Sequence, residues 1–459
     1  MSKLIGRSIA DSPRIQTLIS ELVAEVGKLE EGITTAKPPQ DQFADSAKKL
    51  IDDTNKVRGR PLFYPFLGTG AGRGPYVECE DGSIKLDLIN SIGVGIFGHA
   101  HPRLLQASVR GALSDIVMQG NLEPSVEYVQ LGKKMVELAS KNSRLKHCWF
   151  ATCGTMANET ALKLARQKNT PARFVVAMEN AFAGRSTMMA EVTDNPAYKQ
   201  GLPSYNEVLR LPFYDAKDPG SIEKTLSKLK EHVSNHKKDI AAFSFEPMLG
   251  EGGFKYAPRE YFIPLMEFCK EHHIAVWADE VQTFMRTGEL FAFEKLGIGQ
   301  YIDICTVAKT LQTGATLYTE EYNPQPGLIA GTFSGASAAL SAGMESLKMI
   351  TEDGYLGPNG KIAKIHTEFV GMLNRLNTTT CKGLLQDAGG MGLMVAVTPL
   401  DGSKDAVTKL LFTLYKNGMI AFSCGRDPYK LRFLIPAVME SGDIKLAGEI
   451  LEKSIAELA

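Results

Sequence analysis

Apolar and polar positions in the middle of the chain follow a pattern that predicts a sheet of buried strands. Short apolar runs, each long enough for one strand, alternate with stretches in which apolar residues recur at helical spacing. The apolar runs lie at 148–152, 174–178, 240–245, 274–278 and 304–308, and the helical stretches at 155–168, 185–191 and 259–272. Strand–helix alternation between residues 91 and 340 predicts a mostly parallel sheet covered on both faces.

The segment before this region predicts a helical arm and a small β element. Residues 13–30 carry apolar side chains at helical spacing, and Ser12 and Pro13 suit the N-cap and first turn of a helix. We expect this helix to pack on its own subunit or on a partner. Glycines between residues 68 and 74 resemble a nucleotide loop, but no helix follows them, so we expect a turn between strands. These strands are expected at 76–80 and 84–88.

The last part of the chain predicts a smaller α+β unit. Helices are expected near 337–350, 360–376, 404–417 and 443–458, and strands at 392–397, 419–423 and 430–435. The expected domains are residues 1–90, an N-terminal arm with part of the small domain, residues 91–340, a large domain, and residues 341–459, the C-terminal small domain.

Composition and charge narrow the class of protein. The chain has 459 residues, enough for two or three domains, with 44% apolar residues and a net charge of −1. The lack of a basic surplus argues against nucleic acid as a partner, and no apolar run is long enough to span a membrane. The seven cysteines are scattered, and the N-terminus lacks a secretory signal. We therefore expect a cytoplasmic protein without a metal site.

The strongest chemical signal is a lysine and a carboxylate at the ends of two strands. Lys309 follows the apolar run 304–308, and Asp279 follows the run 274–278. Burying either charge without a function is costly. A cofactor with a carbonyl group and a ring nitrogen would use both, because lysine forms a Schiff base and aspartate keeps the ring protonated. Pyridoxal phosphate (PLP) carries these two groups.

A phosphate site and ring contacts are expected near the same strand ends. A helix starts at Thr155 directly after Gly154, and the free N–H groups of a helix N-terminus bind phosphate. Phe182 is a candidate for stacking on one face of the ring, although a core role is its ordinary interpretation. Val281 lies two positions after the aspartate and is expected to cover the other face. Gln282 is expected to hydrogen-bond the phenolic oxygen.

Two arginines and two glutamates are candidates for the recognition of substrate carboxylates. Arg432 stands among apolar strand residues, and Arg185 follows Phe-Ala-Gly. A planar guanidinium binds a carboxylate through two hydrogen bonds, whereas a surface salt bridge is the ordinary alternative for any single arginine. Glu246 ends a strand and Glu251 lies in a Gly-rich loop. One of these glutamates is expected to form an ion pair with Arg432 and so to control when this arginine is free to bind a substrate carboxylate.

These residues together resemble the class-III (ω-) aminotransferases, the group of ornithine, acetylornithine and 4-aminobutyrate aminotransferases. The resemblance covers roughly residues 60–440. Its most specific stretch, 278–309, contains Asp279-Glu-Val-Gln-Thr, Arg286-Thr-Gly-Glu-Leu-Phe-Ala-Phe, and Asp303 six residues before the lysine. Supporting motifs lie at 98–102, 153–158, 182–185, 246–253 and 331–335.

The resemblance implies a fold and a reaction. The fold would be the α/β type-I fold of PLP-dependent transferases, with a mostly parallel seven-stranded sheet in the large domain and a smaller α+β domain. The reaction would be ping-pong transamination from an ω-amino acid or similar amine to 2-oxoglutarate, in a homodimer with shared active sites.

The resemblance also implies a role for each matching residue. Lys309 would be the Schiff-base lysine and proton shuttle, and Asp279 the partner of the ring nitrogen. The remaining cofactor contacts would come from Gly154, Thr155, Phe182, Glu246, Val281, Gln282 and Thr332, the last reaching the phosphate of the neighbouring subunit. The substrate would be bound by Arg185 at its distal carboxylate, by Arg432 at the α-carboxylate of the oxo acid, by Glu251 as the partner of that arginine, and by Tyr64.

Several positions depart from the family pattern. Ala183 replaces a common His or Trp, and Met156 replaces the usual Glu. The segment 282–286 is one residue short, and the segment 310–314 replaces a Gly-rich turn. The donor therefore stays open among 4-aminobutyrate, ornithine, acetylornithine, lysine and a polyamine.

Three alternatives to a transaminase stay open from the sequence. A PLP-dependent aminomutase, racemase or decarboxylase would share the fold, but a mutase has no separate oxo acid for two arginines to bind. A non-catalytic PLP-binding paralogue is the second alternative, and the presence of Lys309, Asp279 and Thr155 argues against it, because such a protein need not keep them. A protein that binds a dinucleotide or a similar phosphate ligand is the third alternative. Such a protein would carry Gly-x-Gly-x-x-Gly between a strand and a helix, and no such motif directly joins a predicted strand to a predicted helix in this sequence.

Overall fold

The computed structural model describes residues 4–114 and 122–458, which form two compact units. The first unit combines the chain up to Gln106 with the chain from Pro358 onward, and the second unit consists of residues 107–357. We expected the corresponding boundaries after residues 90 and 340.

The second boundary lies further along the chain because helix α12 belongs to the second unit. We assigned this helix to the small domain from its sequence. α12 (Ser337–Glu352) packs against α6 (Val126–Ala139), and Ser337 Oγ donates a hydrogen bond to Gly111 O at 2.8 Å. Eight of its residues are buried, and its packing partner α6 belongs to the second unit.

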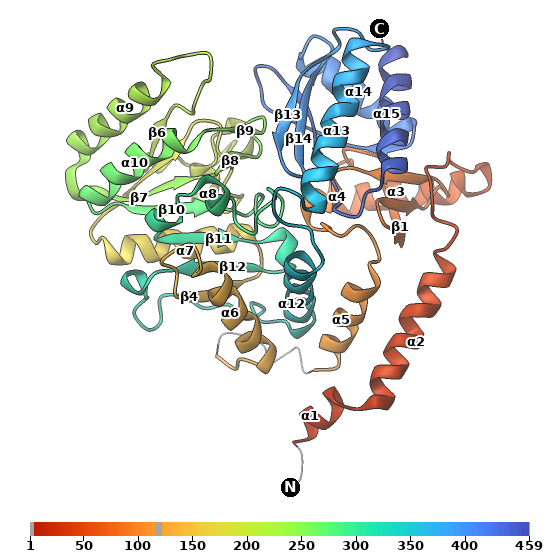
Figure 1. Cartoon of the computed structure of the whole chain (residues 1–459), viewed down its shortest axis with the longest axis horizontal. Helices are drawn as coiled ribbons and strands as arrows, with labels where there is room; N and C mark the ends of the chain where they lie inside the picture. Colours follow the sequence, from red (N-terminus) through yellow and green to blue (C-terminus); the bar gives the residue numbers. More distant parts are fainter. Residues whose placement is uncertain (1–3, 115–121, 459) are drawn as a thin grey trace. The chain divides into compact units, whose positions relative to one another are not determined.

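A seven-stranded, mostly parallel sheet forms the centre of the second unit (Figure 1). The strand order is β4-β12-β11-β10-β7-β5-β6; β12 is antiparallel to both neighbours, and the other adjacent strands are parallel. The strands are β4 (His147–Ala151), β5 (Phe174–Met178), β6 (Val208–Leu211), β7 (Ile240–Phe245), β10 (Ala275–Asp279), β11 (Ile304–Val307) and β12 (Gly314–Tyr318). The α/β class and the mostly parallel sheet are therefore confirmed.

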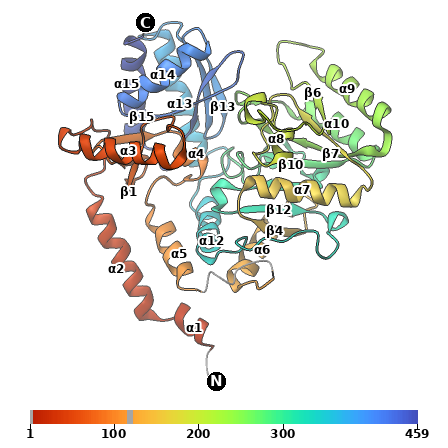
Figure 2. The same cartoon turned by 180° about the vertical axis from the view of Figure 1, so that it is seen from behind.

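Helices cover this sheet and explain the apolar runs. α7 (Gly154–Lys168) packs across β4, β12, β11, β10 and β7 (Figure 2), and α10 (Arg259–Glu271) packs against β10. β5 and β7 are buried along their whole length, which is why each reads as a continuous apolar run. The unit also contains the α-helices α8 (Thr187–Val192), α9 (Ser221–His236) and α11 (Ala292–Leu296) and the short strands β8 (Met248–Leu249) and β9 (Lys255–Tyr256).

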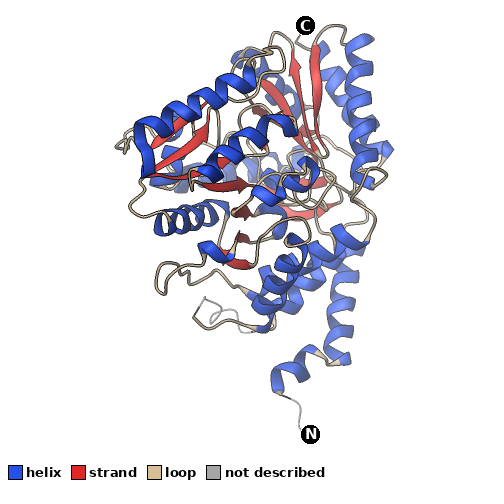
Figure 3. Cartoon of the chain, turned by 60° about the vertical axis from the view of Figure 1, so that its left-hand side comes forward, coloured by secondary structure: helices blue, strands red, loops and turns tan. Residues whose placement is uncertain are grey.

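The first unit contains two four-stranded sheets, ordered β1-β2-β3-β15 and β13-β14-β17-β16. Figure 3 distinguishes the strands of the chain, in red, from its helices, in blue. α13 packs on β13 and α15, and α14 packs on β15 and β16. The strands are β1 (Gly68–Arg73), β2 (Tyr76–Cys79), β3 (Ile84–Asp87), β13 (Leu385–Met391), β14 (Met394–Pro399), β15 (Met419–Ile420), β16 (Phe422–Cys424) and β17 (Lys430–Leu434). The helices are α1 (Ile5–Ala10), α2 (Pro13–Leu29), α3 (Ala44–Arg58), α4 (Asn90–Gly93), α5 (Pro102–Ala112, which crosses the unit boundary), α13 (Lys361–Thr378), α14 (Lys404–Lys416) and α15 (Ser441–Ala456).

The structure confirms the expected arm helix and corrects one predicted strand. α2 begins at Pro13, and Ser12 Oγ accepts a hydrogen bond from the N–H of Ile15 at 3.4 Å. The strand predicted at 419–423 divides at Ala421 into β15, parallel to β3, and β16, antiparallel to β17. One apolar run therefore serves two sheets.

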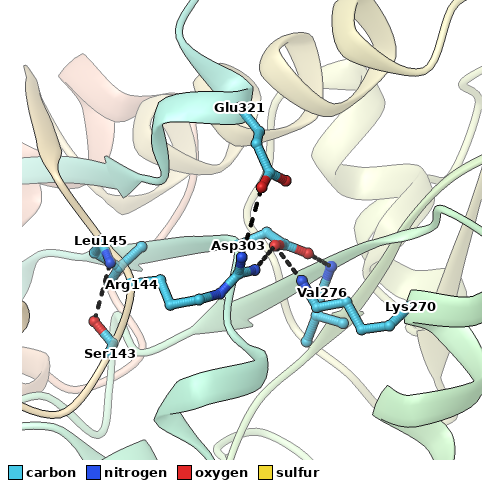
Figure 4. Close-up of polar contacts among 7 residues, drawn as sticks. All are labelled: Ser143, Arg144, Leu145, Lys270, Val276, Asp303 and Glu321. Carbon is cyan, nitrogen blue, oxygen red and sulfur yellow. Dashed lines mark hydrogen bonds and ion pairs between the residues drawn. The ribbon is translucent and has the colours of Figure 1, made fainter.

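Asp303 joins the starts of β10 and β11 (Figure 4). Its Oδ2 accepts a hydrogen bond from the N–H of Val276 at 2.9 Å, and its own N–H donates to Val276 O at 2.9 Å. Arg144 Nη2 lies 2.6 Å from Oδ1 of this buried carboxylate, and Lys270 pairs with the same oxygen. This cluster fixes the register of the two strands that lead to Asp279 and Lys309.

Candidate active site

Five predicted site residues lie at one edge of the seven-stranded sheet. Lys309 follows β11, Asp279 ends β10, and Glu246 follows β7. Phe182 follows β5 after a short loop, and Gly154 starts the helix after β4. β5, β7, β10 and β11 are parallel, and β4 runs the same way because β4 and β11 are both antiparallel to β12. Their carboxyl ends share the edge where ligands bind in such sheets.

Asp279 is a buried carboxylate held by two hydrogen bonds. Its Oδ2 accepts from Nδ2 of Asn158 at 2.7 Å, and its Oδ1 accepts from the N–H of Val281 at 3.0 Å. Burial raises the pKa of Asp279 to about 6, whereas the two hydrogen bonds and the charge of Lys309 act to lower it. At neutral pH the group is mainly ionised and suited to hold a proton on a ring nitrogen.

Lys309 begins a tight turn directly after β11. Its φ is +51°, in the left-handed region that residues other than glycine rarely adopt. The turn, Lys309–Leu311, is fixed by hydrogen bonds from the N–H of Gln312 to Lys309 O at 2.9 Å and from Thr310 Oγ1 to Phe284 O at 3.2 Å. A residue in such a conformation must be held by its surroundings, which is typical of functional sites.

Two glycines, Gly154 at the start of α7 and Gly184, are closely packed against their neighbours. A Cβ on Gly154 would lie 2.6 Å from Cγ1 of Val281, and a Cβ on Gly184 would lie 2.5 Å from Oγ1 of Thr155. Within the described part of the chain, the N-cap side chain of Cys153 accepts no hydrogen bond from the first turn. The first N–H groups of a fifteen-residue helix therefore remain available to an anion.

Glu246 connects the loop after β5 to the loop after β7. Its Oε1 accepts from the N–H of Phe182, and its Oε2 from the N–H of Gly250, each at 2.9 Å. Burial, together with the charge of Asp279, raises the pKa of Glu246 to about 8. The Oε1 atom of Gln282 is also buried and has no hydrogen-bond partner among the described residues. This amide therefore retains hydrogen-bonding capacity for a ligand.

Of four further predicted residues, two belong to the second unit and two to the first. Thr332 is exposed between β12 and α12, and Glu251 is partly buried after β8. Arg432 is buried in β17 of the first unit. Tyr64 is also buried in the first unit, where its hydroxyl donates to Ala421 O at 2.7 Å and its ring stacks on a neighbouring tyrosine. These contacts give Tyr64 a packing role in its unit, and its substrate contact stays a prediction.

Sequence reasoning missed two side chains beside the site. Asn158 lies in α7, where an isolated polar residue reads as part of an ordinary helix face, yet its Nδ2 donates to both Asp279 and Ala183 O. Tyr198 ends a 3-10 turn after α8, and Arg185 stacks on its ring. Each contact joins positions far apart in sequence or separated by a helix, so no local pattern signals it.

The part of the chain that the structure describes contains neither a membrane-spanning helix nor a cluster of metal ligands. In the ranges 4–114 and 122–458, no helix is long and apolar enough to cross a bilayer. The same ranges contain no group of three or more His, Cys, Asp or Glu side chains that could hold a metal ion. His99 instead pairs with Asp87, with Nε2 lying 3.1 Å from Oδ2.

The strand ends thus define a class of enzyme. A buried carboxylate, a lysine in a strained turn and an open helix N-terminus suit a cofactor that carries a ring nitrogen, a carbonyl and a phosphate. The family model of the class-III aminotransferases matches residues 64–455, and the chain belongs to this family. It is a PLP-dependent aminotransferase.

Individual relatives agree with this assignment. The chain is 30% identical over 403 residues to the acetylornithine aminotransferase of Methanocaldococcus jannaschii, covering 84% of this chain and 93% of that relative. It is 28% identical over 414 residues to a probable 4-aminobutyrate aminotransferase of Bacillus subtilis, covering 84% and 92%. The solved lysine aminotransferase from M. tuberculosis has the same fold, with a TM-score of 0.79, 20% identity, and coverage of 89% of this chain and 100% of that chain. The family, fold, enzyme class and cofactor predicted from the sequence are confirmed.

Proposed function

We propose that this aminotransferase moves the amino group of an ω-amino acid or similar amine to 2-oxoglutarate by a ping-pong mechanism. The observation that carries the proposal is the placement of Asp279 and Lys309 at the ends of the adjacent strands β10 and β11. The names of the relatives, acetylornithine and 4-aminobutyrate aminotransferase, support a donor whose reacting amine is remote from a carboxylate.

The residues at the sheet edge fit PLP. Gly154 and Gly184 lie so close to Val281 and Thr155 that neither position has room for a side chain. We assign the phosphate to the first N–H groups of α7, which begin at Gly154. We assign Thr155 as a further phosphate contact, Phe182 and Val281 as the two ring contacts, and Gln282 as the partner of the phenolic oxygen. The unpartnered Oε1 of buried Gln282 supports a ligand at its amide.

Asp279 and Lys309 control where protons are held and transferred during the reaction. When bound, PLP supplies a carbonyl carbon for the amine and a ring that accepts an electron pair. Asp279 keeps the ring nitrogen protonated, because its ionised carboxylate favours a nearby cation. Lys309 Nζ removes the proton from the amine-bearing carbon of the donor, and in the second half-reaction it returns a proton to the corresponding carbon of the acceptor. Glu246 positions Phe182 through its backbone N–H.

The two arginines divide the recognition of carboxylates. Arg185 binds the carboxylate of the donor that is remote from the amine, and Arg432 binds the α-carboxylate of 2-oxoglutarate. Glu251 pairs with Arg432 when the donor is present and releases it for the oxo acid. Tyr64 completes the substrate pocket.

We further propose a cytoplasmic homodimer with shared active sites. Thr332 is exposed in the single chain, as is the neighbouring Phe333 at 68%, which supports a contact from this segment to a second subunit. The outward face of α2 exposes Leu18 and Leu22 and supports the same assembly.

Steady-state kinetics test the reaction. Initial rates measured against donor and 2-oxoglutarate together should give parallel double-reciprocal lines, with one glutamate formed for each donor consumed. Intersecting lines would contradict the ping-pong order. Donor turnover that needs no oxo acid would instead indicate a mutase, racemase or decarboxylase.

A further inference from the structure

Tyr198 contacts both the candidate ring-stacking residue and the candidate carboxylate clamp. Cζ of Arg185 lies 3.7 Å from the centre of the Tyr198 ring in a cation–π contact. The Phe182 ring meets the same tyrosine edge-on, with centroids 6.0 Å apart and planes at 89°. The tyrosine therefore lies beside both residues, which precede and follow the Ala-Gly pair of the loop after β5.

The backbone fixes this tyrosine relative to that loop. Thr193 Oγ1 accepts from the N–H of Ala183 at 2.9 Å and of Gly184 at 3.3 Å, and it donates to Gly184 O at 3.1 Å. Asp194 Oδ2 accepts from the N–H of Asn180 at 2.7 Å. These bonds tie the segment after α8, which ends in the 3-10 turn carrying the tyrosine, to the segment that carries Arg185. The cation–π pair thus joins two segments that are already held together.

Stacking on Tyr198 leaves the N–H groups of Arg185 able to bind an anion. The ring occupies a face of the guanidinium, whereas the N–H donors point outward along its edge, where a carboxylate binds. Arg185 is exposed, and no acidic side chain among the residues that the structure describes forms an ion pair with it. An oriented cation without an internal counter-ion is suited to a carboxylate from a ligand.

We propose that Tyr198 is a positioning residue that orients Arg185 toward the donor carboxylate and so favours donors that carry one. The inference rests on the proposed function, in which Arg185 faces the donor. An exposed cation–π contact of this kind changes an affinity by about two- to five-fold. Because the ring and not the hydroxyl makes the contact, phenylalanine should replace this tyrosine without loss.

The test compares Tyr198→Leu, which removes the ring, with Tyr198→Phe, which keeps it. Arg185→Ala serves as the reference, and Tyr205→Leu serves as a matched control because Tyr205 is an exposed tyrosine in the same region. The PLP-loaded enzymes are titrated with valerate, a carboxylate that cannot react, by calorimetry. Their kinetics are measured with 4-aminobutyrate and with 1,4-diaminobutane, which lacks a carboxylate.

The proposal expects Tyr198→Leu to weaken valerate binding and raise KM for 4-aminobutyrate by about two- to five-fold, with kcat and the diamine kinetics unchanged. Tyr198→Phe and Tyr205→Leu should match the unaltered enzyme. Equal valerate affinity in the unaltered enzyme and Tyr198→Leu would overturn the proposal, as would an equal loss for both donors. Failure of the unaltered enzyme to use 4-aminobutyrate, 1,4-diaminobutane, ornithine, acetylornithine or lysine would contradict the proposed function instead, and the valerate titration would still decide the role of Tyr198.

Discussion

Removing the Asn158 side chain should move the ionisation of Asp279. In Asn158→Ala, Oδ2 of Asp279 loses the 2.7 Å hydrogen bond that helps to hold its pKa down to about 6. A hydrogen bond to a charged group contributes about 1.5–3 kcal/mol, and one pKa unit corresponds to about 1.4 kcal/mol. The pKa of Asp279 in the apoenzyme should therefore rise by about one to two units, to roughly 7–8.

This shift should weaken PLP binding near neutral pH. At pH 7 a carboxyl with a pKa near 6 is about 90% ionised, whereas one with a pKa of 7–8 is roughly 10–50% ionised. The variant should therefore bind PLP about two- to ten-fold more weakly at pH 7, and the difference should shrink as the pH rises and nearly vanish by about pH 9. PLP binding weakens because only the ionised carboxylate of Asp279 stabilises the protonated ring, and the variant has less of the ionised form at pH 7.

The assay is the titration of apoenzyme with PLP between pH 5.5 and 9, followed by absorbance. The ratio of the two dissociation constants at each pH cancels the ionisations of PLP itself. Asn142→Ala is the matched control, because Asn142 is an exposed amide that bonds Glu294. A ratio that stays constant across the whole pH range would refute the reasoning, since it would show that Asn158 does not act through the ionisation of Asp279.

Three further variants test the site. Lys309→Ala should slow the half-reaction with donor by about 100- to 10,000-fold while PLP still binds, and retained half-reaction rates in stopped-flow absorbance would exclude Lys309 as the proton shuttle. Gly154→Ala should weaken PLP binding, because its Cβ would lie 2.6 Å from Val281, whereas Gly27→Ala, with nothing within 4 Å, should not. Equal dissociation constants for PLP in the two variants would contradict the proposed phosphate site at the start of α7. Glu246→Gln should flatten the pH dependence of apoenzyme stability. Burial raises the pKa of Glu246 from 4.5 to about 8, so its contribution is complete below pH 4.5 and lost as pH rises through 8; thermal melts with equal slopes in both proteins would disprove this.

The sequence predicts well those features that depend on local patterns. The strands β5 and β7 have the predicted bounds because both are buried on two faces and read as unbroken apolar runs. Lys309 and Asp279 are predicted as site residues for a related reason, since a charge at the end of such a run is rare and costly. Their common edge then follows from the parallel topology.

Features that depend on contacts between distant segments were not predictable in the same way. β13 contains Gly389 and Gly390, which weaken a strand pattern, and its pairing with β14 decides its conformation. β12 follows the Lys309 turn directly and pairs antiparallel to both neighbours, so no strand–helix alternation marks it. The hydrogen bond from Asn158 to Asp279 spans 121 residues, and only the packing of α7 on the sheet brings the two together.

The most direct test of the central claim is the half-reaction, in which PLP-loaded enzyme is mixed with each ω-amino acid in the absence of any oxo acid. Visible absorption is recorded until it stops changing. The account predicts that one donor class removes the yellow absorption with one oxidised product formed per active site, and that 2-oxoglutarate then restores the absorption while forming glutamate. A yellow enzyme that no amino donor bleaches, or one that turns over donor repeatedly without an acceptor, would contradict it.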